Sequence, residues 1–260
     1  MVFRLEAIMR RFPVAVDLGA RNGAFARALA ASEAREKIDL LIETDLSAPM
    51  LARGGVGVVA DEERLPFKPD SLDLVVSSLA LHWTNDLIGA LIQARLALKP
   101  DGLFIGAFFG GATLTELRQS LLSAEAELSG GASMRVSPFA DASDAGGLLQ
   151  RAGFALPVAD VDRVTVRYGH PVELLRDLRA MGETNVLIER SRTPLTRKVL
   201  GRALELYAEQ FAEADGRVRA TFEIITVTGW SPHESQQKPL PRGSAKMRLA
   251  DALGTTEHKL

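Results

Sequence analysis

The chain has 260 residues, of which 31 are Lys or Arg and 33 are Asp or Glu, so its formal net charge is only -2. This balance excludes the broad basic surface that nucleic-acid backbones or anionic lipids require. The absence of Cys excludes disulfides, cysteine nucleophiles and thiolate metal sites. The longest apolar stretch, residues 102–114, is too short to span a membrane, and the charged N-terminus does not have the form of a signal peptide. We therefore expect a cytoplasmic protein with no nucleic-acid partner and no membrane span.

Five short runs in the first half of the chain are apolar with little polar alternation: residues 14–18, 39–44, 57–59, 72–77 and 103–109. Such runs are typical of strands that are buried on both faces, so the pattern predicts a mostly parallel sheet covered by helices. The clearest helical pattern lies between the last two runs. We expect Thr84 to be its N-cap, and it ends at the turn sequence 99–102.

Four longer helical patterns dominate the second half: residues 114–128, 142–152, 171–181 and 194–211. We expect Thr193 to cap the last of them. Two strand-like runs, 163–168 and 221–228, bracket the two later helices and predict a final antiparallel strand pair. The chain is thus expected to form one α/β domain over residues 1–230, with a helical insertion at about 171–215 and a C-terminal tail at 231–260.

The loop after the first strand is the most informative stretch. The strand contains Asp17, the turn contains Gly19 and Gly23, and a helix begins at Phe25. Glycines in such a turn let a ligand lie against the main chain. A dinucleotide site needs the spacing Gly-x-Gly-x-x-Gly and holds a pyrophosphate, which Asp17 would repel. The same carboxylate attracts the sulfonium and ammonium groups of S-adenosylmethionine, so charge favours that cofactor over NAD. The alternative is an ordinary strand-to-helix turn in which Asp17 caps the helix.

Acidic residues also follow the second and third strand runs. Asp45, with Glu43 as the alternative, stands where a ribose would present two hydroxyl groups, and Asp61 stands where a carboxylate accepts from an adenine amino group. Each acid is equally compatible with a solvated helix cap or turn. Their order, one after each of three successive strands, favours a nucleotide site. Asp73, at the start of the fourth strand, is interpreted as structural.

Four motifs in the first half stand out: Asp17-Leu18-Gly19, Asp45-Leu46-Ser47, Asp61 with Leu65-Pro66-Phe67, and Leu98-Lys99-Pro100-Asp101-Gly102. They resemble the class I S-adenosylmethionine-dependent methyltransferases, in the branch of the malonyl-carrier-protein methyltransferase of biotin synthesis and the ubiquinone-biosynthesis methyltransferases. Residues 81–87, 104–111 and 229–236 extend the resemblance over nearly the whole chain. With these stretches the chain is similar to the methyltransferase-like assembly factor of mitochondrial respiratory complex I and its bacterial relatives.

The resemblance implies a Rossmann-like, seven-stranded sheet that binds S-adenosyl-L-methionine at the carboxyl ends of its first strands. It implies these cofactor-binding residues: Asp17, Gly19 and Gly23 near the methionine part, Asp45 at the ribose, Asp61 with Glu62 near adenine, together with Ala20, Leu46 and Ser78. Two features depart from the family pattern. Arg21 replaces a glycine, and it is either solvated or reaches the methionine carboxylate. About a dozen residues precede the first strand, so the N-terminal cover of the cofactor is expected to be short or missing.

His82 is the candidate catalytic residue, because it is the only His near the predicted cofactor site. Trp83 is the candidate substrate contact. Both are also compatible with simpler roles, His82 as a hydrogen-bonded wall of the pocket and Trp83 as a packing residue. The acceptor is expected to be a small molecule, a carrier-bound group or a protein, and the resemblance adds a respiratory complex I subunit to the expected partners.

Three functions remain open from the sequence. The first is a methyltransferase. The second is an arginine hydroxylase, because the complex I assembly factor is associated with protein hydroxylation. The third is a non-catalytic, cofactor-binding assembly factor. No metal site is expected, since the sequence shows no clustered pair of His with a carboxylate, although His82, His170 and His233 would supply one if the fold brought them together. Four further residues flank the insertion and the last strand: Tyr168, His170, Trp230 and His233. They are compatible with an acceptor channel or with contact to a protein partner, but aromatic residues at strand ends are more often part of the core, so they are not counted as catalytic candidates.

Overall fold

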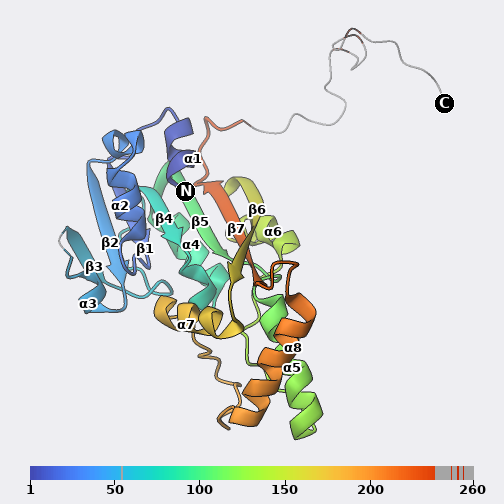
Figure 1. Ribbon diagram of the computed structural model, residues 1–260. Coiled ribbons are helices and arrows are strands. Elements are labelled where there is room, and N and C mark those ends of the chain that lie inside the picture. The colour runs from blue at the N-terminus through green and yellow to red at the C-terminus, as the bar shows by residue number, and fades with distance from the viewer. Residues whose placement is uncertain (54, 238–246, 248–250, 252–253, 255–260) are drawn as a thin grey trace.

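The computed structural model contains a seven-stranded sheet with the strand order β3-β2-β1-β4-β5-β7-β6 (Figure 1). The structure describes residues 1–53, 55–237, 247, 251 and 254, so most of the expected tail at 231–260 lies outside the described residues. The strands are β1 (Val14–Leu18), β2 (Leu40–Asp45), β3 (Val56–Val59), β4 (Leu72–Ser78), β5 (Leu98–Phe109), β6 (Ala155–Tyr168) and β7 (Val218–Trp230). Neighbouring strands from β3 to β5 pair in parallel, and β7 is antiparallel to β5 and β6. The predicted α/β fold, a mostly parallel Rossmann-like sheet, is confirmed.

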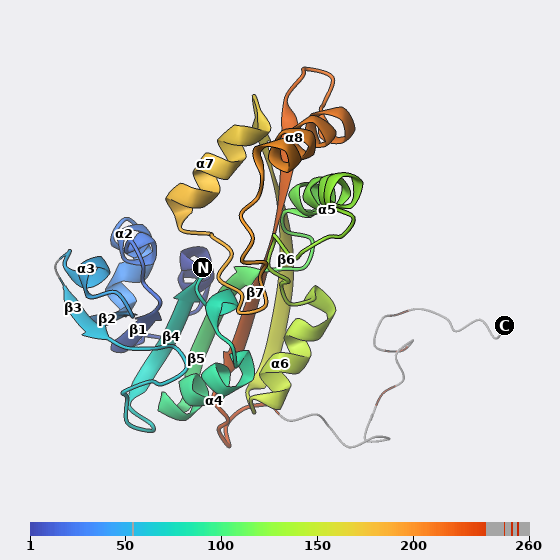
Figure 2. The same ribbon diagram turned by 90° about the horizontal axis from the view of Figure 1, so that it is seen from below.

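The helices cover both faces of the sheet and one of its ends. They are α1 (Val2–Ala7), α2 (Ala24–Ala30), α3 (Ala48–Leu51), α4 (Leu87–Ala97), α5 (Thr115–Ser129), α6 (Ala145–Arg151), α7 (Pro171–Met181) and α8 (Arg197–Phe211), with short 3-10 helices η1 (Glu33–Lys37), η2 (Leu81–Trp83) and η3 (Ala142–Asp144). Helices α1 and α2 pack on one face and α4 and α6 on the other, while α5, α7 and α8 lie beyond the carboxyl ends of β5 and β6 (Figures 1 and 2). None of the described helices combines the length and apolar character that crossing a membrane requires.

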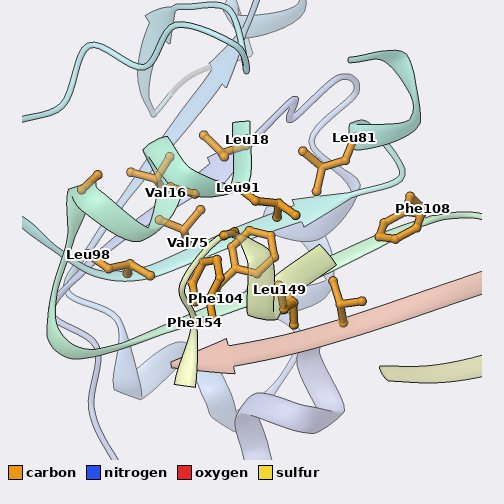
Figure 3. Packing of buried hydrophobic residues seen from close by; sticks show 14 of the residues in the cluster. Val16, Leu18, Val75, Leu81, Leu91, Leu98, Phe104, Phe108, Leu149 and Phe154 are labelled. Carbon is orange, nitrogen blue, oxygen red and sulfur yellow. The ribbon is translucent and has the colours of Figure 1, made fainter. Parts of the chain in front are cut away.

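The core beneath α4 and α6 explains why the strand runs lack polar alternation. Val16, Val75 and Phe104, from β1, β4 and β5, are fully buried and pack with Leu91 of α4 and Leu149 of α6 (Figure 3). The residues next to them along the same strands are buried on the opposite face, under α1 and α2. Strands that are covered on both sides need apolar residues at successive positions, and this is the pattern that the sequence displays.

Two helix starts differ from the prediction. Asp86, rather than Thr84, caps α4, because its Oδ1 accepts from the amide of Gly89 at 2.8 Å. Thr196, rather than Thr193, caps α8. In each case the observed cap is another residue with a short polar side chain, two or three positions further along the chain.

Helix α1 packs toward the amino ends of the strands. Leu5 is buried, and Lys37 of η1 donates to the main-chain carbonyls of Leu5, Glu6 and Ile8 at 2.7–2.8 Å. Just after α1, Arg10 pairs with Asp101, which precedes the buried part of β5. These contacts hold α1 against η1 and α2. The carboxyl ends of the strands are covered by other parts of the chain.

Phe104→Ala is expected to lower the free energy of unfolding by about 3–5 kcal/mol, because it removes buried apolar area and leaves a cavity beside Phe154. The control is Phe3→Ala in α1, where the side chain is 80% exposed and the expected change is within about 0.5 kcal/mol. Urea denaturation measures both values. Similar losses for the two variants would contradict the packing shown in Figure 3.

Candidate functional site

Carboxylates gather at the carboxyl ends of β1 and β2. Asp17 of β1 lies opposite Glu43 of β2 in the parallel register, and Asp45 ends β2. Asp17 is 1% exposed, and neither of its carboxylate oxygens has a hydrogen-bond partner in the described part of the chain. Burial, together with the negative charges of Glu43 and Asp45, raises the pKa of Asp17 to about 8. A buried acid without a partner, at the end of a parallel strand, is what a site for a positively charged group requires. The alternative in which Asp17 caps α2 is wrong, because no amide donates to it.

The glycine loop brings the main chain close to other side chains. Gly19 and Gly23 both have positive φ, +67° and +72°. A Cβ at Gly19 would lie 2.3 Å from the Cβ of Ala80 and 2.8 Å from Oε1 of Glu62, and a Cβ at Gly23 would lie 2.9 Å from Nε of Arg53. Only glycine fits at these two positions. The side chains of Glu62 and Arg53 therefore lie against this loop.

Arg21 makes contacts that the sequence did not indicate. Its main chain has φ +48°, and its amide donates to Oδ2 of Asp45 at 2.8 Å. Its guanidinium points toward the end of α7, where it donates to Oε1 of Glu183 at 2.9 Å and to the carbonyl oxygens of Leu79 and Met181. The Arg21 side chain is therefore not simply solvated, and its contact with the methionine carboxylate of a cofactor stays a prediction. Arg21 thus links the glycine loop to the end of α7 and the segment after it. This part of the second half of the chain covers the loop.

The remaining predicted cofactor residues lie around the same loop. Asp45 accepts from the amides of Arg21 and Ser47, both at 2.8 Å, and the apolar side chain of Leu46 is 63% exposed. Ala20 is buried and its amide donates to the carbonyl of Thr44, while Ser78 is half-buried at the end of β4. An exposed leucine next to this acidic crevice is a surface on which a flat apolar group can pack.

Asp61 and Glu62 follow β3. Oδ1 of Asp61 accepts from the amide of Glu63, so this acid closes a turn. Burial raises the pKa of Glu62, and the neighbouring charges of Asp45, Asp61 and Glu63 raise it further. Glu62 therefore belongs electrostatically to the same crevice as the acids of β1 and β2. Asp73 lies elsewhere and is structural as predicted, because it accepts from the amide of Val14 and from Lys99.

His82 and Trp83 line a second hollow, a cavity of about 350 Å³ between η2, the start of α5 and residues 183–189. The His82 side chain is 4% exposed, and its Nε2 lies 3.2 Å from Oε2 of Glu183. Nδ1 has no partner in the described residues. The ring centroid of Phe109 is 4.8 Å from that of His82, and Trp83 is 36% exposed. The sequence did not single out Glu183, because a charged residue after a helix carries no functional signal until the fold places it beside His82.

The other candidate residues do not join this site. Nδ1 of His170 caps α7 by accepting from the amide of Val172, whereas His233 pairs with Ser235 near the amino end of β5. Tyr168 and Trp230 are at opposite ends of the β6–β7 pair, so the expected acceptor channel from these residues is wrong. In the part of the chain that the structure describes, no group of three or more His, Asp or Glu side chains is arranged to hold a metal ion. The three-histidine cluster is likewise not formed.

A family model described as a methyltransferase domain matches residues 16–106. The chain is 44% identical over 254 residues to the mitochondrial arginine-hydroxylase NDUFAF5 of Danio rerio and to that of Homo sapiens; the alignments cover 95% of this chain and 78% and 72% of those proteins. It is 34% identical over 251 residues to the malonyl-[acyl-carrier protein] O-methyltransferase of Halorhodospira halophila, covering 94% of this chain and 83% of that protein. A putative methyltransferase from Bacillus halodurans shares the fold, with a TM-score of 0.59 at 18% identity, covering 89% of this chain and 97% of that structure.

The Asp17→Asn variant is expected to be more stable than the parent protein at pH 8, by about 1–3 kcal/mol, because a neutral amide avoids a buried, unpartnered charge. The pKa of about 8 in the folded state exceeds the ordinary value of 3.8, so the folded state binds the proton more tightly than the unfolded state. The parent therefore loses stability as the pH rises through this range, and loses no more above it.

Urea denaturation at several pH values tests this expectation. The advantage of Asp17→Asn should grow from acidic pH to about pH 8 and then level off. The control is Asp39→Asn, at an exposed acid paired with Arg11, which should show little change over the same range. An advantage of Asp17→Asn that does not vary with pH would contradict the raised pKa.

Proposed function

Because this chain belongs to the class I S-adenosylmethionine-dependent methyltransferase family, in the branch that includes NDUFAF5 and the malonyl-carrier-protein methyltransferases, we propose that it is an enzyme that transfers a methyl group from S-adenosylmethionine to an acceptor held beside His82. The observation that carries the proposal is the buried, unpartnered carboxylate of Asp17 next to two glycines that allow close approach. The acceptor is a small molecule, a carrier-bound group or a protein, and a respiratory complex I subunit is among the proposed partners.

The residues at the carboxyl ends of β1 to β3 fit this cofactor. A cation placed beside Asp17 favours its ionised form, which compensates the cost of burial, so the sulfonium and ammonium groups suit this position. Asp45 is assigned to the ribose hydroxyls and the exposed Leu46 to packing against the adenine ring, with Asp61 and Glu62 near the adenine amino group. When bound, the cofactor supplies a methyl group on a positively charged sulfur, which makes the methyl carbon electrophilic.

The protein's main contribution to methyl transfer is alignment and exclusion of water. The η2 segment that carries His82 and Trp83 begins three residues after Ser78 of β4, and the 350 Å³ cavity lies on its other side. Ala80 of the same segment contacts Gly19 of the cofactor loop. This short separation along the chain between the glycine loop's contact at Ala80 and the cavity at His82 is suited to holding an acceptor close to the methyl group.

Arginine hydroxylation is a second candidate, because the relatives at 44% identity are named arginine hydroxylases, whereas the malonyl-carrier-protein relative is at 34%. The described residues offer no cluster of three His or acidic ligands for an iron ion, so the structure provides no metal-binding step for this candidate. The third candidate function is that of a non-catalytic assembly factor, which binds the cofactor and a complex I subunit.

Asp45→Ala is expected to weaken the binding of S-adenosylhomocysteine about 10- to 100-fold, because a charge-assisted hydrogen bond to the ribose is lost. Isothermal titration calorimetry measures the affinity. Asp39→Ala, at the exposed acid just before β2, is the control and should bind as the parent does. A thermal unfolding curve checks that Asp45→Ala stays folded, since Asp45 also accepts two main-chain amides. Equal affinity of Asp45→Ala and parent would remove Asp45 from the site.

The purified protein is expected to move labelled methyl groups from S-adenosylmethionine to a cellular acceptor, and Asp17→Asn should abolish most of this transfer because it removes the negative charge that faces the cofactor. Scintillation counting of treated lysate fractions gives the methyl signal, and mass spectrometry of the same fractions detects oxygen added to arginine. Oxygen on arginine without methyl transfer would favour the hydroxylase. Neither product, with a complex I subunit co-purifying, would favour the assembly factor.

A further inference from the structure

Glu183 connects the cofactor loop with the acceptor cavity. It follows α7 by two residues, and its side chain is only 10% exposed. One carboxylate oxygen accepts from Arg21 of the glycine loop at 2.9 Å, and the other lies 3.2 Å from Nε2 of His82. Burial raises the pKa of Glu183, but the hydrogen bonds from His82 and Arg21, together with the positive charge of Arg21, hold the pKa below its usual value. Glu183 is therefore ionised at neutral pH.

An ionised carboxylate can only accept hydrogen bonds, so Nε2 of His82 must carry the hydrogen that faces Glu183. In a neutral imidazole the other nitrogen, Nδ1, then has a free lone pair. That nitrogen is buried and has no hydrogen-bond partner in the described residues. Leaving a buried acceptor unpaired costs free energy, and the cost is recovered when a donor arrives in the adjoining cavity.

Aromatic side chains surround the imidazole of His82 and hold the ring in place. Phe109, Phe139 and Trp83 have ring centroids 4.8, 5.9 and 5.4 Å from the His82 ring. These rings restrict the orientation of the imidazole, and the carboxylate of Glu183 faces Nε2, where it can stabilise the positive charge that forms when the ring accepts a proton. This combination is that of a general base whose orientation is fixed by a second residue.

We infer that Glu183 is a positioning residue that holds His82 with its hydrogen on Nε2, so that Nδ1 accepts a proton from the hydroxyl or amine group of the methyl acceptor. This inference rests on the proposed methyltransferase function and narrows its substrate class. The acceptor oxygen or nitrogen bonds to the methyl carbon as the carbon–sulfur bond breaks, and the bonding electron pair stays on sulfur. The acceptor's proton passes to Nδ1. A carboxylate acceptor has no proton to give at neutral pH and is therefore not the expected substrate.

The tautomer of His82 is measured by nuclear magnetic resonance on protein labelled with ¹⁵N in histidine, without any methyl transfer. His82→Gln identifies the His82 signals. In its neutral form the parent ring should carry its hydrogen on Nε2, and Glu183→Gln should convert this to a mixture of tautomers, because a neutral amide donates as well as accepts. Glu183→Asp keeps the carboxylate and should retain the parent pattern in large part. Glu189→Gln, at an exposed residue that lines the same cavity, is the control and should change nothing.

Activity provides the second readout. Glu183→Gln is expected to lower kcat of methyl transfer about 100-fold or more, with partial recovery in Glu183→Asp. The labelled product should survive treatment with base, since methyl ethers and amines are stable where methyl esters release volatile methanol. A His82 hydrogen on Nδ1, a parent pattern in Glu183→Gln, or a base-labile product would overturn the inference. If the tautomer pattern is as expected but no variant transfers methyl groups, the proposed function fails and the role of Glu183 in orienting His82 stands.

Discussion

The structure depends on one electrostatic constraint, the confinement of several carboxylates where three parallel strands end. Asp17 is fully buried beside Glu43, and Asp45 and Glu62 lie close by. Asp17 and Glu43 are shielded from water, and the described protein groups leave the carboxylate of Asp17 without a hydrogen-bond partner. Such an arrangement lowers the stability of the isolated fold and raises its affinity for a cation. The sign of the charge, more than the number of glycines, therefore distinguishes this crevice from one that holds a pyrophosphate.

The two halves of the chain meet at this crevice. The first half supplies the strand ends and the glycine loop, and the second half returns through α7 to cover them. The two halves are joined by the ion pair between Arg21 and Glu183. The Arg21 guanidinium also donates to the main-chain carbonyls of Leu79 and Met181. The helical segment between β6 and β7 thus lies over these strand ends, while α1 packs near the opposite ends of the strands, in line with the expectation that an N-terminal cover is short or missing (Figures 1 and 2).

Features set by local patterns were predictable, and features set by distant contacts were not. The bounds of β1 and of α7 agree with the sequence prediction because apolar periodicity depends on near neighbours. β6 begins at Ala155, eight positions before the predicted residue 163, because an edge strand with mostly exposed side chains has no apolar run to reveal it. The acids after the first three strands were found from their order. Glu183 was missed because it meets His82 across 101 residues of sequence, a pairing that no local pattern encodes.

The position of Arg53 bears on what binding at the crevice involves. Its guanidinium donates to Oε1 of Glu43 and to the carbonyl of Arg21, and it lies against Gly23. A cationic ligand that bound against Gly23 would meet this internal counter-ion, and in taking its place beside Glu43 it would exchange one cation for another. The observed affinity for the ligand is then the difference between its attraction to the acidic side chains and that of Arg53. The total charge around the glycine loop changes little. Ionic strength should accordingly have only a weak effect on the equilibrium, while free guanidinium compounds should compete with the ligand.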